Sequence, residues 1–380
     1  MEYTARELLS QLYHAAIDAV DGRFCVQQWM QQHPFQPQYV IAIGKAASAM
    51  LQGAMETGAQ VKGALLISNA ARLPRKLLKD RRIRFVQAAH PIPDENSLQA
   101  GEALLQFVHS TPDDARLLFL ISGGSSSMVD VLRDGVTLEQ LQTLNRQLLA
   151  SGKSIAQMNA ARRELSRIKG GGLLDFLGER HAVQLLISDV KGDDPRVIGS
   201  GLLAAEQRSV ETHIIATLDD ALRAAQLQAQ QYDLPVTLHR GFIEGEAAEQ
   251  GKRLAEILLA AASGVHLFGG ETTVTLPHKP GIGGRNQTLA LAMAPQLAGE
   301  DICVMCAGTD GIDGCTPCAG AVTTGDTAAR AQQMGFDIEQ ELAAANAGAV
   351  LMATGDLFKP GPTNTNVMDL VLAYKRGEGV

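Results

Sequence analysis

The sequence predicts an α/β protein built around a mostly parallel β-sheet. Short β-branched runs alternate with longer helical patterns along most of the chain. Several of the short runs are continuously apolar, such as LLFLI and VQLLI, which is typical of strands covered on both faces. The helical patterns between them are those of helices packed around such a sheet.

The expected strands are runs rich in apolar and β-branched residues. They lie at 39–43, 64–68, 83–88, 117–121, 183–187, 212–216, 266–268, 272–276, 302–307 and 366–373. The strands at 266–268 and 272–276 are close enough in sequence to form a hairpin.

Helical periodicity fills the intervals between these strands. It is found at 46–57, 97–108, 138–150, 218–230, 244–261 and 326–334, and the first twenty residues also form an amphipathic pattern. The segment Thr137-Leu-Glu-Gln140 has the form of a capping box, which predicts a helix start at residue 138.

With 380 residues, the chain is long enough for two domains. The regular alternation of strands and helices gives way to glycine-dense loops near Arg240. We therefore expect an N-terminal domain at 1–240 and a smaller α/β domain at 241–380.

Composition excludes several classes of protein. The net charge is −8 and aromatic residues make up 4%, which argues against binding to nucleic acid or a membrane surface. No apolar run reaches membrane-spanning length, and the N-terminal segment lacks the pattern of a signal peptide. Five cysteines are typical of a reducing compartment, so a cytoplasmic location is expected. The oligomeric state, including a homodimer, stays open.

Polar residues gather where five expected strands end. The strands lead into Gly44-Lys45, the run from Ser122, the acids from Asp189, Glu271 after a glycine pair, and Asp310 in GTDGIDG. Because the carboxyl ends of parallel strands line the ligand crevice of an open sheet, these loops predict one large polar site. Several acids with few aromatics fit phosphate chemistry.

Two of these loops have the residues of a phosphate site. In the run Ser122, Gly123, Gly124 and Ser125, glycines let backbone N–H groups approach an anion, and serines add donors. The alternative is a tight turn between strand and helix. Lys45 can meet a phosphate as a point charge, or it is an exposed lysine in the first turn of a helix.

The acids and the remaining polar loops offer metal and substrate ligands. Oxygen-rich Asp189, Asp193 and Asp194 suit Mg²⁺, or one of them accepts a proton from an attacking hydroxyl. Turn formation and helix capping are the alternative functions for these acids. Further candidates are Arg285, which follows a flexible glycine run and can clamp a carboxylate or phosphate, and Asn364 and Asn366, which can bind hydroxyls or phosphate.

Two patterns compete with this interpretation. Cys303, Cys306, Cys315 and Cys318 form two C-x-x-C pairs, but only eight residues separate the pairs, which is short for a zinc site. The segment 199–204 matches G-x-G-x-x-A, as in dinucleotide-binding proteins, although little strand precedes it and little helix follows.

Taken together, the motifs resemble the class II glycerate 2-kinases. The matching segments include VIAIGKAA, AAHPIPDENS, LISGGSSSM, ASGKSIAQMNAARRELSRIKGG, LISDVKGDDPRVIGSG, FGGETTVTL, GIGGRNQTLALAMA, CAGTDGIDGCTPCAGA and PGPTNTNVMDL, which lie in the family's order over 39–370. The resemblance implies a Rossmann-like N-terminal domain, a smaller C-terminal domain and a site in the cleft between them. It marks Lys45 and Arg285 as important for activity. Gly172 and Thr288 depart from the family pattern, where an arginine and a glutamate are usual.

The resulting hypothesis is an ATP- and Mg²⁺-dependent kinase that phosphorylates the 2-hydroxyl of D-glycerate. In this hypothesis Lys45, Arg285 and Asp189 are catalytic, and Gly44, the Ser122–Ser125 turn, Asn364 and Asn366 bind nucleotide phosphates. Glu271 and Asp310 bind substrate, and Asp193 and Asp194 hold the metal. The alternatives are a nicotinamide-dependent hydroxypyruvate reductase, a kinase for a related hydroxy acid, and a sensor that binds ligand without turnover.

Overall fold

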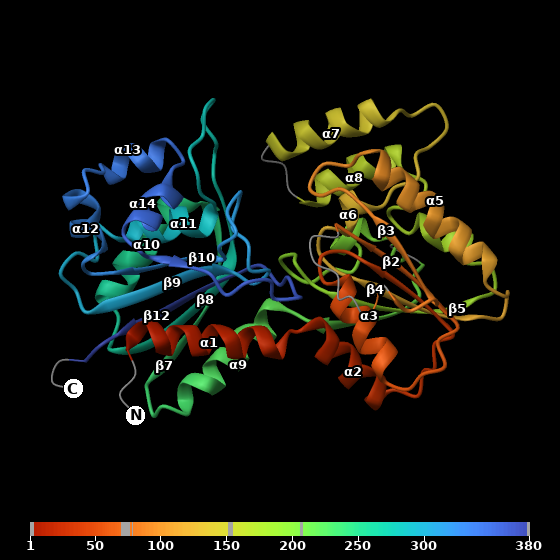
Figure 1. The fold of residues 1–380 in the computed structure, drawn as a ribbon, viewed down its shortest axis with the longest axis horizontal. Coiled ribbons are helices and arrows are strands. Elements are labelled where there is room, and N and C mark those ends of the chain that lie inside the picture. The colour runs from red at the N-terminus through yellow and green to blue at the C-terminus, as the bar shows by residue number, and fades with distance from the viewer. Residues whose placement is uncertain (1–3, 70–76, 78, 151–154, 206–207, 378–380) are drawn as a thin grey trace. The chain divides into compact units, whose positions relative to one another are not determined.

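The computed structural model describes residues 4–69, 77, 79–150, 155–205 and 208–377 (Figure 1). The chain divides into two compact units, which we name by their sheets. The parallel-sheet unit comprises Val20–Thr217 and Asn364–Asn366, and the mixed-sheet unit comprises Met1–Ala19, Leu218–Thr363 and Val367–Val380. No helix in the described ranges is long and apolar enough to cross a membrane.

The parallel-sheet unit confirms the expected α/β architecture. Its six strands run parallel in the order β3-β2-β1-β4-β5-β6. Their bounds are β1 Tyr39–Ile43, β2 Gly63–Ser68, β3 Ile83–Gln87, β4 Arg116–Ile121, β5 His181–Ile187 and β6 Glu211–Ala216. The strand order changes direction between β1 and β4. In open sheets the ligand crevice usually lies at the carboxyl ends of the two strands on either side of such a point.

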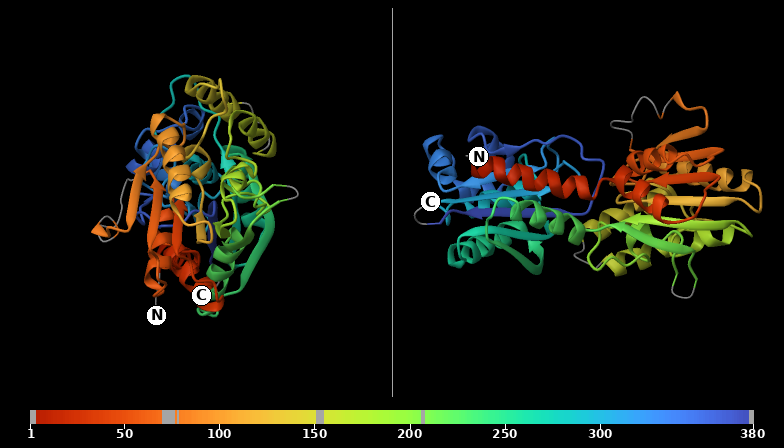
Figure 2. Two further views of the ribbon diagram at one scale, coloured as in Figure 1. Left: turned by 90° about the vertical axis from the view of Figure 1, so that its right-hand side faces the viewer. Right: turned by 90° about the horizontal axis from the view of Figure 1, so that it is seen from below.

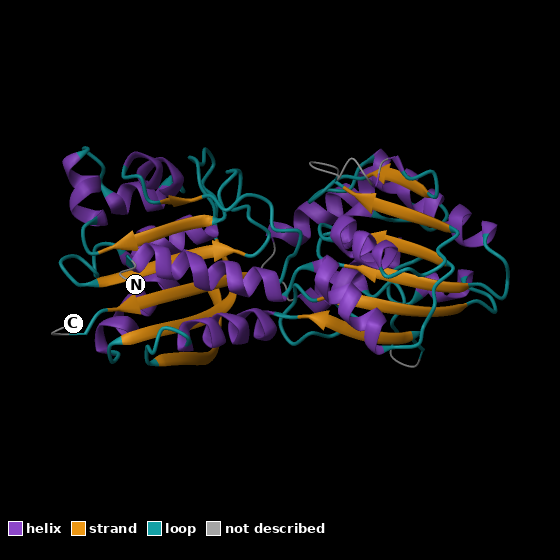
Figure 3. Cartoon of the chain, turned by 60° about the horizontal axis from the view of Figure 1, so that its bottom comes forward, coloured by secondary structure: helices purple, strands orange, loops and turns teal. Residues whose placement is uncertain are grey.

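Helices cover both faces of this sheet (Figure 3). They are α2 Gly22–Gln32, α3 Ala47–Glu56, α5 Glu95–Ser110, α6 Ser125–Met128, α7 Leu138–Ala150 and α8 Ile155–Leu165, with short 3₁₀ turns η1 Gly172–Phe176 and η2 Ile198–Ser200. Thr137 and Gln140 exchange the two hydrogen bonds of the predicted capping box at the start of α7. The apolar strands and helices enclose one buried core that includes Phe119, Leu104 and Ile41.

The mixed-sheet unit has strand order β11-β10-β9-β12-β8-β7. Only β7 and β8 pair in parallel, and the other neighbours are antiparallel. The strands are β7 Val236–Glu246, β8 Gly264–Thr273, β9 Ile302–Gly308, β10 Gly320–Thr324, β11 Leu357–Phe358 and β12 Asp369–Lys375. The helices are α1 Ala5–Ala19, α9 Leu218–Gln230, α10 Ala247–Ala260, α11 Arg285–Met293, α12 Thr327–Gln333, α13 Ile338–Ala343 and α14 Ala347–Ala353.

The two units do not divide at the expected boundary near Arg240, because the first helix belongs to the mixed-sheet unit. The apolar face of α1, which includes Leu8, Leu12 and Tyr13, is buried. It packs on α9 and on strands β9 and β12, as Figure 2 shows for the red helix lying along the blue strands. The Tyr13 hydroxyl also donates to the Gly308 carbonyl at 2.8 Å. These contacts assign residues 1–19 and 218–240 to the mixed-sheet unit.

The predicted hairpin at 266–276 is wrong. Residues 264–273 form the single strand β8, and Gly269 and Gly270 lie within it. A Cβ on Gly270 would lie 2.1 Å from the Ile243 carbonyl oxygen, and one on Gly269 would lie 2.8 Å from the Leu218 side chain. The glycine pair therefore permits close approach of neighbours rather than a turn.

Candidate active site

Two predicted phosphate-binding loops lie side by side in the parallel-sheet unit. Strands β1 and β4 pair with Ile43 opposite Ile121, so Gly44 and Ser122 leave the sheet at the same edge. The Ser122 N–H donates to the Ile43 carbonyl at 3.0 Å, and the Lys45 N–H donates to the Gly123 carbonyl at 2.9 Å. The Ser122 hydroxyl is fully buried and accepts the Ala46 N–H. These hydrogen bonds join the two loops. As a result, half-buried Lys45 lies beside the glycine turn.

Glycine is required at two positions of these loops. Gly44 has φ +123°, and a Cβ there would lie 2.4 Å from the Ser122 hydroxyl. A Cβ on Gly123 would lie 2.1 Å from Asp189 Oδ2 and 2.6 Å from Asn366 Nδ2. The backbone of the glycine turn therefore lies directly against a carboxylate and an amide.

Asp189 and Asn366 complete this cluster. Asp189 follows β5, the strand next to β4, and Asn366 Nδ2 donates to its Oδ2 at 3.3 Å. The Asn366 segment is held in the same unit because the Thr365 hydroxyl donates to the Val20 carbonyl at 2.6 Å. Four candidates that are far apart in sequence thus lie together in this unit: Lys45, the Ser122 turn, Asp189 and Asn366.

The other end of the glycine turn contains an unexpected neighbour. Gly124 is left-handed at φ +83°, and a Cβ there would lie 2.9 Å from the His90 ring. Ser125 is fully buried, and its hydroxyl has no hydrogen-bond partner within the described part of the chain. The segment AAHPIPDENS that contains His90 matches the family pattern, but its chemistry alone did not single out this histidine.

The two acids predicted to hold metal differ in their surroundings. Both Asp194 oxygens accept hydrogen bonds from the Arg196 guanidinium, at 2.6 to 3.1 Å, and this pairing lowers the pKa of Asp194. Asp193 is left-handed at φ +52° and partly exposed, without a side-chain partner among the described residues. In that part of the chain, no three His, Cys, Asp or Glu side chains form a ready metal cluster.

Asn364 lies two residues before Asn366 but in a different setting. It is exposed, left-handed at φ +62°, and lines a hollow of about 250 Å³. The other lining residues come from the N-terminal parts of α2 and α3 and the cap before α2: Asp21, Arg23, Ser48, Ala49 and Gln52. No described contact joins Asn364 to the Asp189 cluster.

Arg285 is the first residue of α11 in the mixed-sheet unit, and all three of its guanidinium nitrogens contact carboxylates. Its Nε and Nη2 donate to the Asp369 carboxylate at 2.5 and 2.9 Å, and Nη1 pairs with Glu271 Oε1 at 2.9 Å. Burial lowers the pKa of Arg285, but the Asp369 and Glu271 carboxylates outweigh it and raise the pKa overall. The guanidinium fork is therefore already occupied by an acid that sequence analysis did not select. An acid inside the apolar run VMDLVLAY was the available signal.

A third acid caps the same helix. Asp313 is 2% exposed, and its carboxylate accepts the N–H groups of Asn286 and Gln287 at 3.1 and 2.8 Å. Burial raises the pKa of Asp313 to about 7 despite these donors. The Asp369 carboxylate contributes to this shift, and Arg285 opposes it.

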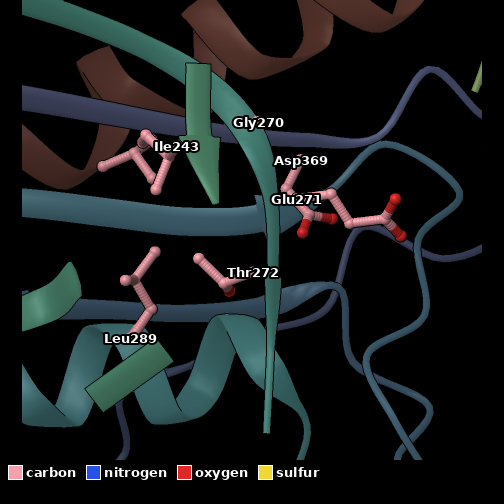
Figure 4. Close-up of a pocket in the computed structure, with 7 residues that line it drawn as sticks. Ile243, Gly270, Glu271, Thr272, Leu289 and Asp369 are labelled. Atoms are coloured by element: carbon pink, nitrogen blue, oxygen red, sulfur yellow. The ribbon is translucent and has the colours of Figure 1, made fainter. Parts of the chain in front are cut away.

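The predicted substrate ligands of this unit lie near this network. Glu271 and Asp369 occupy one side of a small pocket, with Ile243 and Leu289 on the other side (Figure 4). Asp310 is partly buried at the end of β9, where its Oδ1 accepts the Ile312 N–H at 3.1 Å. The mixed-sheet unit therefore brings together Glu271, Arg285 and two further acids.

The segment 199–204 does not have the form of a dinucleotide turn. It lies in the 3₁₀ turn η2 and an isolated bridge between Ala204 and Ser209, and the described residues around it form neither a strand directly before it nor a helix directly after it. Gly199, Ser200 and Gly201 are all left-handed. The sequence pattern that favoured a reductase is thus an irregular loop.

Comparisons with known proteins cover almost the whole chain. Residues 8–231 match a domain of unknown function (DUF4147), and residues 264–369 match the MOFRL family. The D-glycerate 2-kinase of Thermotoga maritima is 30% identical, with 97% of each chain covered. A protein of Agrobacterium vitis named "Putative hydroxypyruvate reductase" is 32% identical, covering 97% of this chain and 94% of that protein. The crystal structure of a glycerate kinase from Thermotoga maritima is similar with a TM-score of 0.85 at 30% identity, covering 97% of this chain and 99% of that one.

Proposed function

This chain belongs to the glycerate 2-kinase family, and from that premise we propose that it phosphorylates the 2-hydroxyl of D-glycerate with ATP. The observation that supports this most is the cluster at the carboxyl ends of β1, β4 and β5. It joins a lysine, a glycine turn and a carboxylate within one unit. Phosphoryl transfer needs little beyond positioning and charge stabilisation, and these groups supply both.

The reaction has a simple balance of bonds. The 2-hydroxyl oxygen forms a bond to the γ-phosphorus of ATP, and the bond from that phosphorus to the β,γ-bridging oxygen breaks. ADP leaves with the electron pair, and the hydroxyl proton passes to Asp189. The products are 2-phosphoglycerate and ADP.

Each side chain of the cluster has a distinct task in this proposal. Lys45 faces the phosphates as a point charge and stabilises charge that develops in the transition state. The Gly123 and Gly124 backbone approaches the phosphates closely, with the Ser122 hydroxyl holding the turn. Asn366 orients the Asp189 carboxylate through its hydrogen bond to Oδ2, so that the other oxygen can take the proton.

A divalent cation fits the donors that this unit provides. Mg²⁺ is commonly held by one or two carboxylates together with substrate phosphates and water. The Asp193 carboxylate is suited to this because it has no partner in the described part of the chain, whereas Asp194 is engaged by Arg196. When bound, the cation would neutralise phosphate charge.

The acids of the mixed-sheet unit are assigned to substrate hydroxyls, with Glu271 and Asp310 as acceptors. We assign Arg285 a positioning role, because its fork already holds Asp369 and its third nitrogen holds Glu271. This differs from the sequence-based hypothesis, in which Arg285 clamps the acceptor carboxylate or a phosphate.

The experiment is an ATP-dependent assay with D-glycerate in which enolase converts 2-phosphoglycerate and so reports the position of the new phosphate. We expect ADP and 2-phosphoglycerate to form in equal amounts. Formation of 3-phosphoglycerate would correct the regiochemistry, and absence of ADP formation would reject the kinase.

A reductase is the second candidate because one relative has that name. Its proposed cofactor turn at 199–204 is irregular, so we expect no oxidation of NADH or NADPH in the presence of hydroxypyruvate. The assay is run beside the kinase assay on the same preparation. Hydroxypyruvate-dependent loss of NADH or NADPH without ADP formation would reverse our ranking.

A further inference from the structure

Arg162, on α8 of the parallel-sheet unit, is surrounded by neutral partners. Its Nε donates to Asn145 Oδ1 at 3.1 Å. Its Nη1 makes only long contacts of 3.4 Å, to the Ser126 hydroxyl and to Asn159 Oδ1. Nη2 donates no hydrogen bond to any described residue, and no described carboxylate pairs with this guanidinium. The two terminal nitrogens are therefore left for another acceptor.

The nearby acid cannot neutralise Arg162 because it is already paired. Asp130 forms an ion pair with Lys169, and both side chains are buried. The Ser166 hydroxyl also donates to Asp130 at 2.5 Å. Burial lowers the pKa of Lys169, and Arg162 is close enough to lower it further. Two cations thus share one carboxylate, which leaves one positive charge in excess.

This excess charge is unfavourable for the ligand-free fold. Burial lowers the pKa of Arg162 and is opposed only by the distant charge of Asp130. Removing an ion from water costs several kcal/mol unless a partner compensates. An anionic ligand would supply such a partner.

The surroundings of Arg162 contain one buried hydroxyl that has no partner among the described residues, that of Ser125. Ser126, which Arg162 contacts, follows the glycine turn directly and lies against the Ser200 hydroxyl at 2.5 Å. The neighbouring Ser125 hydroxyl is buried without a partner among the described residues. Gly199 lies against it, because a Cβ there would be 2.4 Å from Ser125 Oγ. Ser200 is left-handed at φ +61°, a conformation that is uncommon for serine and often found at functional sites.

We propose that Arg162, with the hydroxyls of Ser125 and Ser126, binds the carboxylate of the acceptor, an inference that rests on the proposed kinase function. Two terminal guanidinium nitrogens can donate two parallel hydrogen bonds to the two oxygens of a carboxylate. In the other unit, the fork of Arg285 is already on Asp369. Lys45 supplies the point charge for phosphate, so the planar cation is assigned to the planar anion.

The test compares an acceptor with and without the carboxylate. Wild type, Arg162→Gln and Arg162→Lys are assayed with D-glycerate, with glycerol and with varied ATP. Arg146→Gln is the matched control, because Arg146 lies on α7 next to Asn145 and is exposed. We expect Arg162→Gln to raise the KM for D-glycerate by roughly 10- to 100-fold, the scale of a hydrogen-bonded charge, with the KM for ATP little changed.

The preference for D-glycerate over glycerol should fall by a similar factor in Arg162→Gln, because glycerol has no carboxylate to lose. Arg162→Lys should stay closer to Arg162→Gln than to wild type, since lysine keeps the charge but not the fork. The Tm of the ligand-free Arg162→Gln protein should equal or exceed that of wild type, because the excess buried charge is removed.

Each other result counts against the proposal. A rise in the KM for ATP alone would assign Arg162 to a phosphate, and a lower Tm with unchanged KM values would make it structural. If wild type shows no turnover, the kinase proposal fails separately, and calorimetric titration with D-glycerate then decides. Equal affinity of wild type and Arg162→Gln in that titration would overturn the assignment of the carboxylate.

Discussion

Arg162 in the parallel-sheet unit and Arg285 in the mixed-sheet unit show two opposite uses of the same side chain. Arg285 donates to two carboxylates and is neutralised within its own unit. Among the described residues, Arg162 reaches amide and hydroxyl oxygens alone, while the nearest described acid serves Lys169. The first arrangement stabilises the fold, and the second leaves a charge that a ligand can neutralise. We propose that the number of acids around a half-buried arginine, more than its position in a motif, separates the positioning role of Arg285 from the ligand-binding role of Arg162.

The largest effect should follow removal of divalent cations. EDTA should abolish activity without lowering the Tm, and Mg²⁺ should restore activity, because the cation acts with the phosphates rather than in the fold. Asp193→Asn should raise the Mg²⁺ concentration needed for half-maximal rate, whereas Asp194→Asn should change it little. Full activity in EDTA would remove the cation from the proposal.

Lys45→Ala should lower kcat by roughly a hundredfold, the usual scale of one preorganised charge contact, and leave the Tm near that of wild type. Lys62→Ala is the control, because Lys62 is an exposed lysine of the same unit. Steady-state kinetics with saturating ATP and D-glycerate give the comparison. Activity within a few-fold of wild type would make Lys45 a surface lysine.

Arg285→Ala should act mainly on stability. Asp369 is 4% exposed and would lose the cation that neutralises it. We expect a loss of about 2–4 kcal/mol in the free energy of unfolding of the mixed-sheet unit, somewhat below the loss for a fully buried pair. Chemical denaturation measures it, with Arg253→Ala on the exposed side of α10 as control. An unchanged unfolding curve, with a raised KM for D-glycerate, would restore Arg285 to the acceptor carboxylate.

The last prediction concerns pH. The pKa of Asp313 is raised from the ordinary value of about 4 to about 7, so the native state holds a proton that the unfolded state releases. Its favourable contribution is complete below pH 4 and is lost as pH rises toward 7. The advantage of wild type over Asp313→Asn should therefore decrease across this range, by up to about 1.4 kcal/mol per pKa unit. Denaturation at pH 4.5 and 7.5 provides the measurement, and a difference independent of pH would contradict the shift.

Sequence reasoning predicts the strands of the parallel sheet well, and with them the edge at which the candidate residues lie. Strands β1, β4 and β5 are continuous apolar runs, and the polar residues after them have few other places to lie. These polar residues are neighbours because β1, β4 and β5 are adjacent in the sheet. Asn366 contacts Asp189 because a segment from near the C-terminus returns to this unit, which the strand pattern does not predict.

Sequence reasoning could not predict which charged side chains pair with one another. Arg285 follows a glycine run that is compatible with either a clamp or a helix start, and only the register of β12 shows that Asp369 lies in its reach. Arg162 lies in a helix with other charged residues, and its lack of an acid emerges only from the Lys169–Asp130 pair. The glycines of β8 mislead for a related reason, because close approach of Ile243 and Leu218 is a tertiary requirement.

The place of β12 has a consequence for how the protein is made. Residues Asp369–Lys375 form an inner strand between β8 and β9, and α1, at Ala5–Ala19, packs against them. During synthesis the mixed-sheet unit therefore stays without a central strand until Lys375 has emerged, while Val20–Thr217 can fold much earlier. Because Asn366 reaches Asp189 only at that late stage, we expect that a prematurely terminated chain ending before residue 364 would hold an incomplete catalytic cluster.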